Sequence, residues 1–190
     1  MRPTDFAQHV TDFLARYLPG ERNLSANTVR SYRDAFILLL RYLRDEKGLP
    51  PEKVSLDAVD ASLIRDWLDN LENRGRTART RNQRLAAIHS FFRYLQVEEP
   101  SRILQAQRIL AIPFRRYERR PVVYLDEQEI SALLAQPDTS TERGRRDAVL
   151  LSLLYDTGAR SQELLDLRVR DIRCEAPANV RLTGKGRKVR

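Results

Sequence analysis

Cysteine, histidine and long apolar segments are scarce in this chain of 190 residues. Its one cysteine, Cys174, cannot form a disulfide within the chain, which favours a reducing compartment. The two histidines, His9 and His89, stand far apart, so no metal site is expected. No apolar run reaches the roughly 18 residues of a membrane helix, and the N-terminus lacks the apolar core of a signal peptide. We therefore expect a soluble intracellular protein.

Acidic residues are missing from one part of the chain, since none lies between Glu72 and Glu98. Residues 76–120 hold 11 basic and 3 acidic residues and so account for the whole formal charge of +8. Residues 1–75 sum to −1 and residues 121–190 to +1. Because a solvated surface normally mixes charge signs, this one-sided block predicts a polyanionic partner such as a nucleic acid. A basic surface that serves solubility alone is the simpler alternative.

Apolar residues recur at helical spacing through the first 112 residues. Pro19-Gly20, Gly48 to Pro51 and Gly75 interrupt the pattern. The expected helices are 4–18, a long helix that starts at the N-cap Ser25, 56–71, 76–95 and 101–111. These helices predict an all-helical domain over residues 1–112.

Two of these helices carry a polar face besides the apolar one. On the helix after Ser25, four arginines share an arc of about 80° away from the core stripe. The helix over 76–95 has a basic first turn where acids are usual, so an outside anion would satisfy both its dipole and its arginines. Its small and amide side chains would let it enter a DNA major groove. The DNA-binding candidates on the two helices are Thr28, Arg30, Arg33, Arg41, Arg44, Arg76, Thr77, Arg79, Thr80, Asn82, Gln83 and Arg84.

Residues 113–121 are expected to form a linker between two domains. Proline stands at both ends of this segment, and no apolar period runs through it. Its arginines are further candidates for contacts with phosphates. They are Arg115, Arg116, Arg119 and Arg120.

Residues 122–190 predict a second domain that mixes helices and strands. Asp126 is the expected N-cap of its first helix, with an acid three residues later as in a capping box. The next helix, 143–156, is apolar nearly all round and should be central to a second core. A short helix over 161–165 and a Gly-rich turn between two strands at 183–189 complete the pattern.

Five segments resemble the tyrosine recombinase, or phage integrase, family, and its Xer-like branch most closely. LSANTVRSYRDAF (24–36) and TRNQRLAAIHSFFRYL (80–95) are similar to that family's core-binding domain. YLDEQEISALL (124–134), DTGARSQELLDLRVRDI (156–172) and LTGKGRKVR (182–190) are similar to its catalytic domain. The resemblance implies a mainly α fold: a SAM-like helical bundle, followed by the start of an α+β catalytic domain with a small antiparallel sheet.

The resemblance also implies a chemistry that needs no metal or cofactor. In this family a tyrosine attacks the scissile phosphate of double-stranded DNA and forms a 3′-phosphotyrosyl link. Arg160 matches the family's first catalytic arginine, whose guanidinium holds the non-bridging phosphate oxygens. Lys185 matches the lysine that protonates the leaving 5′-oxygen, and Glu163 matches an acid that supports the arginine. Arg187 and Lys188 are expected to neutralise backbone phosphates.

The family pattern continues with a His-x-x-Arg box, a further His or Trp and a nucleophilic tyrosine, which this sequence lacks after Lys185. We therefore expect the N-terminal two-thirds of a bacterial, nucleoid-associated cytoplasmic enzyme whose protomers pair on two sites, inactive in cleavage by itself. One alternative is a non-catalytic DNA-binding module that occupies recombination sites. Another is a helical interaction protein whose basic block binds an acidic partner, for which DNA affinity would not fall with salt.

Overall fold

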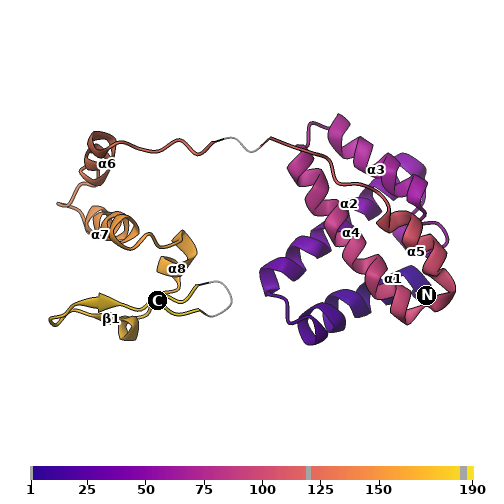
Figure 1. Ribbon diagram of the computed structural model, residues 1–190, viewed down its shortest axis with the longest axis horizontal. Helices are drawn as coiled ribbons and strands as arrows, with labels where there is room; N and C mark the ends of the chain where they lie inside the picture. The colour runs from indigo at the N-terminus through magenta and orange to yellow at the C-terminus, as the bar shows by residue number, and fades with distance from the viewer. Residues whose placement is uncertain (1, 119–120, 185–187) are drawn as a thin grey trace. The chain divides into compact units, whose positions relative to one another are not determined.

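The computed structural model of the chain divides into two compact units, Met1–Arg119 and Arg120–Arg190 (Figure 1). It describes residues 2–118, 121–184 and 188–190. The first unit is helical, and the second combines helices with a two-stranded antiparallel sheet. The mainly α fold class expected from the sequence is thereby confirmed. Among the described residues, no helix combines the length and hydropathy that crossing a bilayer requires.

The first unit consists of α1 (Asp5–Asp12), a π-helical segment (Phe13–Glu21), α2 (Ala26–Lys47), α3 (Ala61–Asn73), α4 (Ala78–Glu98) and α5 (Ile103–Leu110), with 3₁₀ turns at Pro51–Lys53 and Pro100–Arg102. Side chains that accept a backbone N–H three residues ahead start four of the helices, as N-caps do. These N-caps are Thr4, Ser25, Asp60 and Thr77. The sequence predicted the one at Ser25.

Two boundaries in this unit differ clearly from the sequence-based expectation, and the others differ by three residues or fewer. Pro19 lies inside the π-helical segment rather than ending the first helix. An α-helix disfavours an interior proline because its ring clashes with the carbonyl four residues earlier, and around Pro19 the chain follows the i→i+5 pattern of a π-helix instead. The third helix begins at Ala61 rather than 56, because Asp60 caps it. Leu56 and Val59 still enter the core, from the loop that precedes the helix.

Aromatic side chains form the centre of the first unit, where α4 packs against α2, α3 and α5 (Figure 1). The ring centroid of Phe91 lies 5.4 Å from that of Phe13, 5.3 Å from that of Phe36 and 5.9 Å from that of Phe6. Phe91 and Phe13 are fully buried. Edge-to-face packing of this kind adds to the stabilisation from burial. The helices that carry the DNA-binding candidates therefore stand on a dense core.

The second unit consists of α6 (Glu127–Leu134), α7 (Glu142–Thr157), α8 (Ser161–Leu165), a 3₁₀ turn (Val169–Asp171), β1 (Ile172–Arg173) and β2 (Asn179–Val180). The strands pair antiparallel, with Ile172 opposite Val180. Thr183 forms a further antiparallel bridge with Val189. The expected capping box is present, since Asp126 accepts the N–H of Glu129 at 2.8 Å and Glu129 accepts that of Asp126 at 2.9 Å.

The expectation that α7 forms the centre of a second core was wrong. Its apolar residues are half-buried at most, and Val149 is 59% exposed. Among the described residues of this unit, the buried apolar side chains are Leu164 and Leu182. The helices α6 and α8 pack on α7 and cover only part of its circumference, which leaves the rest of an all-round apolar helix open.

Candidate functional site

The candidate side chains at the start of α4 have different roles, since one caps the helix and two are exposed arginines. The hydroxyl of Thr77 accepts the backbone N–H of Thr80 at 3.2 Å, so this candidate caps the helix. Arg76 and Arg79 are exposed, and within the described residues neither pairs with a carboxylate. The acid-free first turn of α4 therefore keeps two uncompensated positive charges beside its positive dipole end.

Two candidates on α4 join this helix to α2. Gln83 Nε2 donates to Ser31 Oγ at 2.8 Å, and an Arg84 guanidinium nitrogen donates to the Ser31 carbonyl at 3.2 Å. The predicted DNA-binding helices are thus tied to each other at one point. Gln83 remains exposed beside this contact, whereas Arg84 is half-buried.

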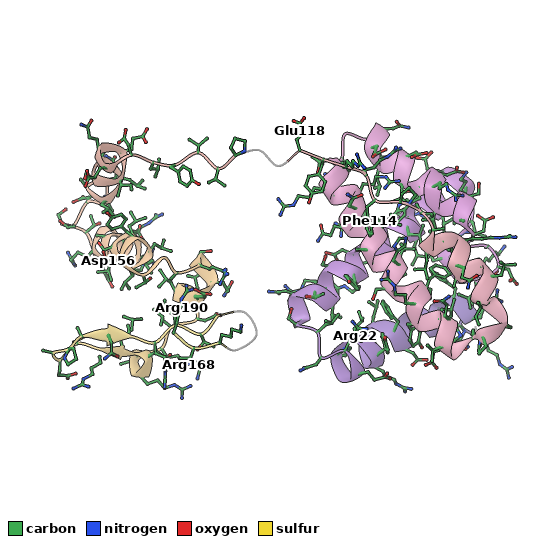
Figure 2. The ribbon with its side chains drawn as sticks, viewed as in Figure 1. Arg22, Phe114, Glu118, Asp156, Arg168 and Arg190 are labelled. Carbon is green, nitrogen blue, oxygen red and sulfur yellow. The ribbon has the colours of Figure 1, made fainter. Side chains whose placement is uncertain are left out.

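Asn82 contacts the chain that follows the last helix of the first unit. Its Nδ2 donates to the Arg115 carbonyl at 2.7 Å, and its Oδ1 accepts the Arg115 N–H at 2.9 Å. Phe114 precedes Arg115 on the segment that leaves the helices of the first unit (Figure 2). Its ring packs edge-on against that of His89, with 5.3 Å between the ring centroids. The linker therefore begins alongside α4, and the amide predicted to face DNA positions it. Arg116 is exposed, while Arg119 and Arg120 lie outside the described residues.

The arginines of α2 all reach solvent. They are Arg30, Arg33, Arg41 and Arg44. Arg44 pairs with Asp45 at 2.7 Å, a contact that lowers the pKa of this carboxyl group. In the described part of the chain, Arg33 and Arg41 have no carboxylate partner. Thr28 belongs to the helix start, because its N–H donates to the Ser25 hydroxyl at 3.3 Å.

In the second unit, one buried carboxylate gathers two arginines. Glu163 is 6% exposed, and its Oε1 accepts the guanidinium of Arg160 at 2.7 Å. Its Oε2 accepts the Arg160 backbone N–H at 3.0 Å and the guanidinium of Arg190 at 2.8 Å. The backbone hydrogen bond from Arg160, together with the two guanidinium groups, lowers the pKa of Glu163. The carboxylate therefore stays charged and fixes the candidate catalytic arginine.

Arg160 opens the short helix α8, where its backbone and side chain both bind Glu163. Its side chain is 68% exposed, so the guanidinium can still reach a ligand from solvent. A hollow of about 360 Å³ adjoins it and is lined by Arg160, Glu163, Gly184, Lys188, Val189 and Arg190. The arrangement presents positive charge on a surface where an oxyanion would fit.

Lys185 and Arg187, the predicted general acid and phosphate ligand of the Gly-rich turn, lie outside the described residues. Next to them, Gly184 donates its N–H to the Lys188 carbonyl at 2.7 Å. A Cβ built on Gly184 would lie 2.9 Å from Glu163 Oε1, so the chain passes close to that carboxylate. Over the described ranges, no three or more His, Cys, Asp and Glu side chains gather as metal ligands.

Two family models match the chain. The model described as "Phage integrase, N-terminal SAM-like domain" matches residues 10–99, and "Phage integrase family" matches residues 123–190. The chain belongs to the phage integrase family. Each of the two units of this integrase-family chain thus carries one of the matched regions.

Curated relatives support the same assignment. The "Putative integrase/recombinase y4rC" of Sinorhizobium fredii is 44% identical over 179 residues, which are 94% of this chain and 54% of that protein. The tyrosine recombinase XerC of Pelotomaculum thermopropionicum is 32% identical over 177 residues, covering 93% of this chain and 56% of the relative. This integrase-family chain therefore spans about half the length of these curated relatives.

Solved structures show the same fold. The XerH site-specific recombinase, in a post-cleavage complex with a palindromic difH substrate, matches with a TM-score of 0.62 and 21% sequence identity. The match covers 89% of this chain and 49% of that one. The pre-cleavage complex of XerH with difH matches with a TM-score of 0.60. The integrase-family chain thus shares the fold of a recombinase solved with its difH substrate.

Sequence reasoning missed two site features of this integrase-family chain. It gave no role to Arg190, which the structure places on Glu163 and whose guanidinium also donates to the Gly158 carbonyl at 3.3 Å. It also missed Ser31, the residue that receives the contacts from Gln83 and Arg84. A serine within a helix carries no sequence signal for a partner 52 residues away. Arg190 pairs 27 residues from its partner, beyond the reach of any helical spacing rule.

Proposed function

We propose that this chain binds double-stranded DNA as the DNA-binding portion of a site-specific tyrosine recombinase. The observation that carries the proposal is the set of exposed arginines without carboxylate partners on two helices that are tied together. Within the described residues, these are Arg33 and Arg41 on α2, Arg79 on α4 and Arg76 just before it. The relatives that bear recombinase names and the XerH–DNA complexes support the same partner.

Charge and shape together favour DNA over an acidic protein. The contact of Gln83 and Arg84 with Ser31 ties α4 to α2. Arg41, Arg76 and Arg84 line one pocket between these helices, so arginines of both helices share a surface there. A rigid surface of this kind suits the regular phosphate spacing of a duplex. The linker, held by Asn82 at Arg115, carries the exposed Arg116 directly after that contact. Arg119, Arg120, Arg187 and Lys188 remain further proposed phosphate contacts.

The proposal extends to the phosphate chemistry of the second unit. Arg160 would hold the non-bridging oxygens of the scissile phosphate, and Glu163 is the positioning residue that orients it. Lys185 would protonate the leaving 5′-oxygen. Pairing of protomers on two sites and residence in the bacterial nucleoid belong to the same proposal.

Salt dependence of duplex binding tests the proposal. We expect the affinity for a labelled duplex, measured by fluorescence anisotropy, to fall steeply with salt because several arginines displace counterions. Arg33→Gln should weaken binding and lower the slope of log K against log salt by about 1. Arg108→Gln changes another exposed arginine, on α5, and should leave both quantities unchanged. An affinity that does not respond to salt would contradict the proposal and favour an acidic protein partner.

A further inference from the structure

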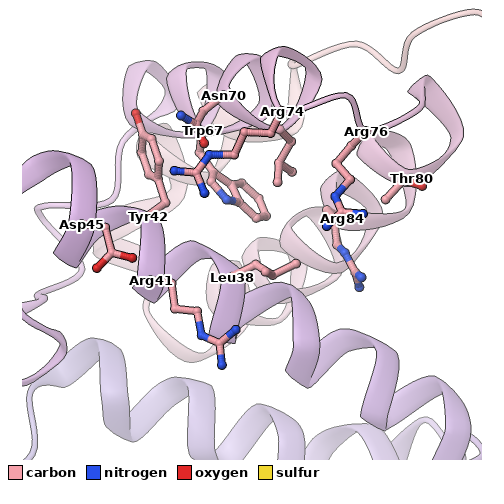
Figure 3. Close-up of a pocket in the computed structure, with 11 residues that line it drawn as sticks. Leu38, Arg41, Tyr42, Asp45, Trp67, Asn70, Arg74, Arg76, Thr80 and Arg84 are labelled. Atoms are coloured by element: carbon pink, nitrogen blue, oxygen red, sulfur yellow. The ribbon is translucent and has the colours of Figure 1, made fainter.

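A pocket of about 320 Å³ opens in the first unit between α2, α3 and α4 (Figure 3). Four arginines line it: Arg41 from α2, Arg74 from the end of α3, Arg76 from the turn that follows, and Arg84 from α4. In Figure 3 the indole ring of Trp67 lies among these side chains. Most small-molecule pockets are apolar with few polar groups. This pocket instead concentrates guanidinium groups.

The positive charge of the pocket is only partly compensated. Arg74 is occupied, because its guanidinium donates to Glu46 at 2.7 Å. The one carboxylate in the lining, that of Asp45, accepts a hydrogen bond from Arg44 at 2.7 Å. Arg41 and Arg76 pair with no carboxylate in the described part of the chain. The pocket thus keeps free positive charge, which favours an anion as its ligand.

Two buried donors at this pocket have no acceptor. Trp67 is fully buried, and its Nε1 has no hydrogen-bond partner among the described residues. The Nε of Arg84 is likewise buried and without a partner there. Buried N–H groups are almost always satisfied in folded proteins, so two such groups at one site call for an acceptor from outside. An indole N–H and a guanidinium can only donate, so a ligand that satisfies them must offer acceptor atoms, as an oxyanion does.

We propose that this pocket binds one phosphate group and that this group belongs to the backbone of a DNA duplex. The inference deepens the proposed function and rests on it for the source of the phosphate. The planar forks of Arg41 and Arg76 match the oxygens of a phosphate. Arg84 joins the pocket to the α2–α4 contact at Ser31, so a duplex on that surface would carry a phosphate to the pocket mouth. Free phosphate has the same chemistry and is the alternative source.

The chain has one tryptophan, and it lines this pocket. Trp67 fluorescence therefore reports on the pocket alone. We expect a duplex oligonucleotide to change that fluorescence saturably, in parallel with the anisotropy of labelled DNA. Inorganic phosphate, compared with sodium chloride at equal ionic strength, should produce the same change at much higher concentration. This arm distinguishes a phosphate of DNA from a free one.

Variants separate the pocket from the rest of the surface. We expect Arg76→Gln to weaken duplex binding about 10-fold and to suppress the Trp67 response, because a charge-assisted hydrogen bond is lost. Trp67→Phe keeps an aromatic ring, although a smaller one, and removes the N–H. It should weaken binding, read by anisotropy, by about 2- to 10-fold. Arg108→Gln on α5 is the matched control and should change neither readout. Thermal unfolding followed by circular dichroism verifies that each variant is folded.

Three results would contradict the pocket proposal or the DNA source of its phosphate. If the duplex binds without any change in Trp67 fluorescence, and Arg76→Gln behaves like Arg108→Gln, the pocket proposal is overturned. The proposed function then stands if Arg33→Gln, which changes an arginine outside the pocket, still weakens binding and lowers the salt slope. If no duplex binds but inorganic phosphate saturates the Trp67 signal, the site is a free-phosphate pocket and both the DNA source and the proposed function fail. If neither ligand changes the signal, the pocket binds no phosphate.

Discussion

The two units position their candidate residues by different means. In the first unit, α2 and α4 stand on a core that includes Phe13, Phe91 and Trp67, all fully buried. In the second, the described residues bury few apolar side chains, and Arg160 is held by the carboxylate of Glu163. A packed core fixes helices as rigid bodies, whereas an ion cluster fixes individual side chains. The proposed DNA surface therefore lies on a scaffold, that is, on helices fixed by a packed core. The proposed phosphate site at Arg160 is instead held by a local network of ion pairs and hydrogen bonds around Glu163.

The largest expected loss of stability comes from a substitution in the core of the first unit. Phe91→Ala removes the ring that contacts Phe13 and Phe36, and we expect it to lower the free energy of unfolding by about 3–5 kcal/mol. Urea unfolding followed by circular dichroism measures the loss.

Leu182→Ala in the second unit is the comparison, since Leu182 is 3% exposed but stands between the exposed residues Arg181 and Thr183. We expect it to cost about 1–2 kcal/mol, because such a site can relax into the space left. Equal losses for Phe91→Ala and Leu182→Ala would remove the distinction between a scaffold and a local network.

Local patterns in the sequence predicted much of the fold and less of the site. Apolar periodicity gave the helices, and cap chemistry gave the starts at Ser25 and Asp126, because both signals act within a few residues. The roles of Asn82 and Gln83 were not predictable from spacing. Their partners lie 33 and 52 residues away, at Arg115 and Ser31, and only tertiary packing brings them together.

The apolar sequence of α7 gave a wrong prediction because a local pattern does not determine which neighbours cover a helix. An all-round apolar helix becomes central only when neighbours cover every side of it. The described neighbours of α7 leave Val149 exposed. Sequence periodicity describes what a helix can bury, and packing decides what it does bury.

A second, smaller loss of stability is expected in the first unit at alkaline pH. Burial, with the nearby charges of Glu98 and Asp12, raises the pKa of Tyr94 to about 12. An unfolded chain ionises this phenol near its ordinary value of about 10. The resulting stability is complete below about pH 10 and is lost as the pH rises through about 12, with a loss of roughly 1–3 kcal/mol.

Urea unfolding at about pH 9 and about pH 11.5 measures this change. Other tyrosines and lysines also ionise in this range, so the difference between wild type and Tyr94→Phe isolates the contribution of Tyr94. The variant should lose less stability on going to high pH than the wild type does. Parallel losses in the two proteins would show that the packed core does not retain the Tyr94 proton.

A third loss of stability is expected where the linker begins, at the contact between Asn82 and Arg115. Asn82→Ala removes both hydrogen bonds to Arg115, and we expect a loss of about 1–2 kcal/mol. Trypsin should then cleave after Arg115 and Arg116 faster than in the wild type, since this backbone is no longer held against α4. Asn27→Ala, at an exposed amide on α2, is the control and should leave the cleavage rate unchanged. Unaltered cleavage in Asn82→Ala would mean that the amide does not position the linker.

The smallest expected losses of stability come from removing one helix N-cap in each unit. Thr77→Ala and Asp126→Ala each remove a helix N-cap, worth about 1 kcal/mol. Thr77 caps a helix that is packed on three others, so its loss should shift one cooperative transition. Asp126 caps α6, none of whose residues is buried, so its loss should fray that helix without moving the main transition. Circular dichroism in water and in urea distinguishes the two responses. A cooperative shift in Asp126→Ala would show that α6 is integrated into a core as firm as that of the first unit.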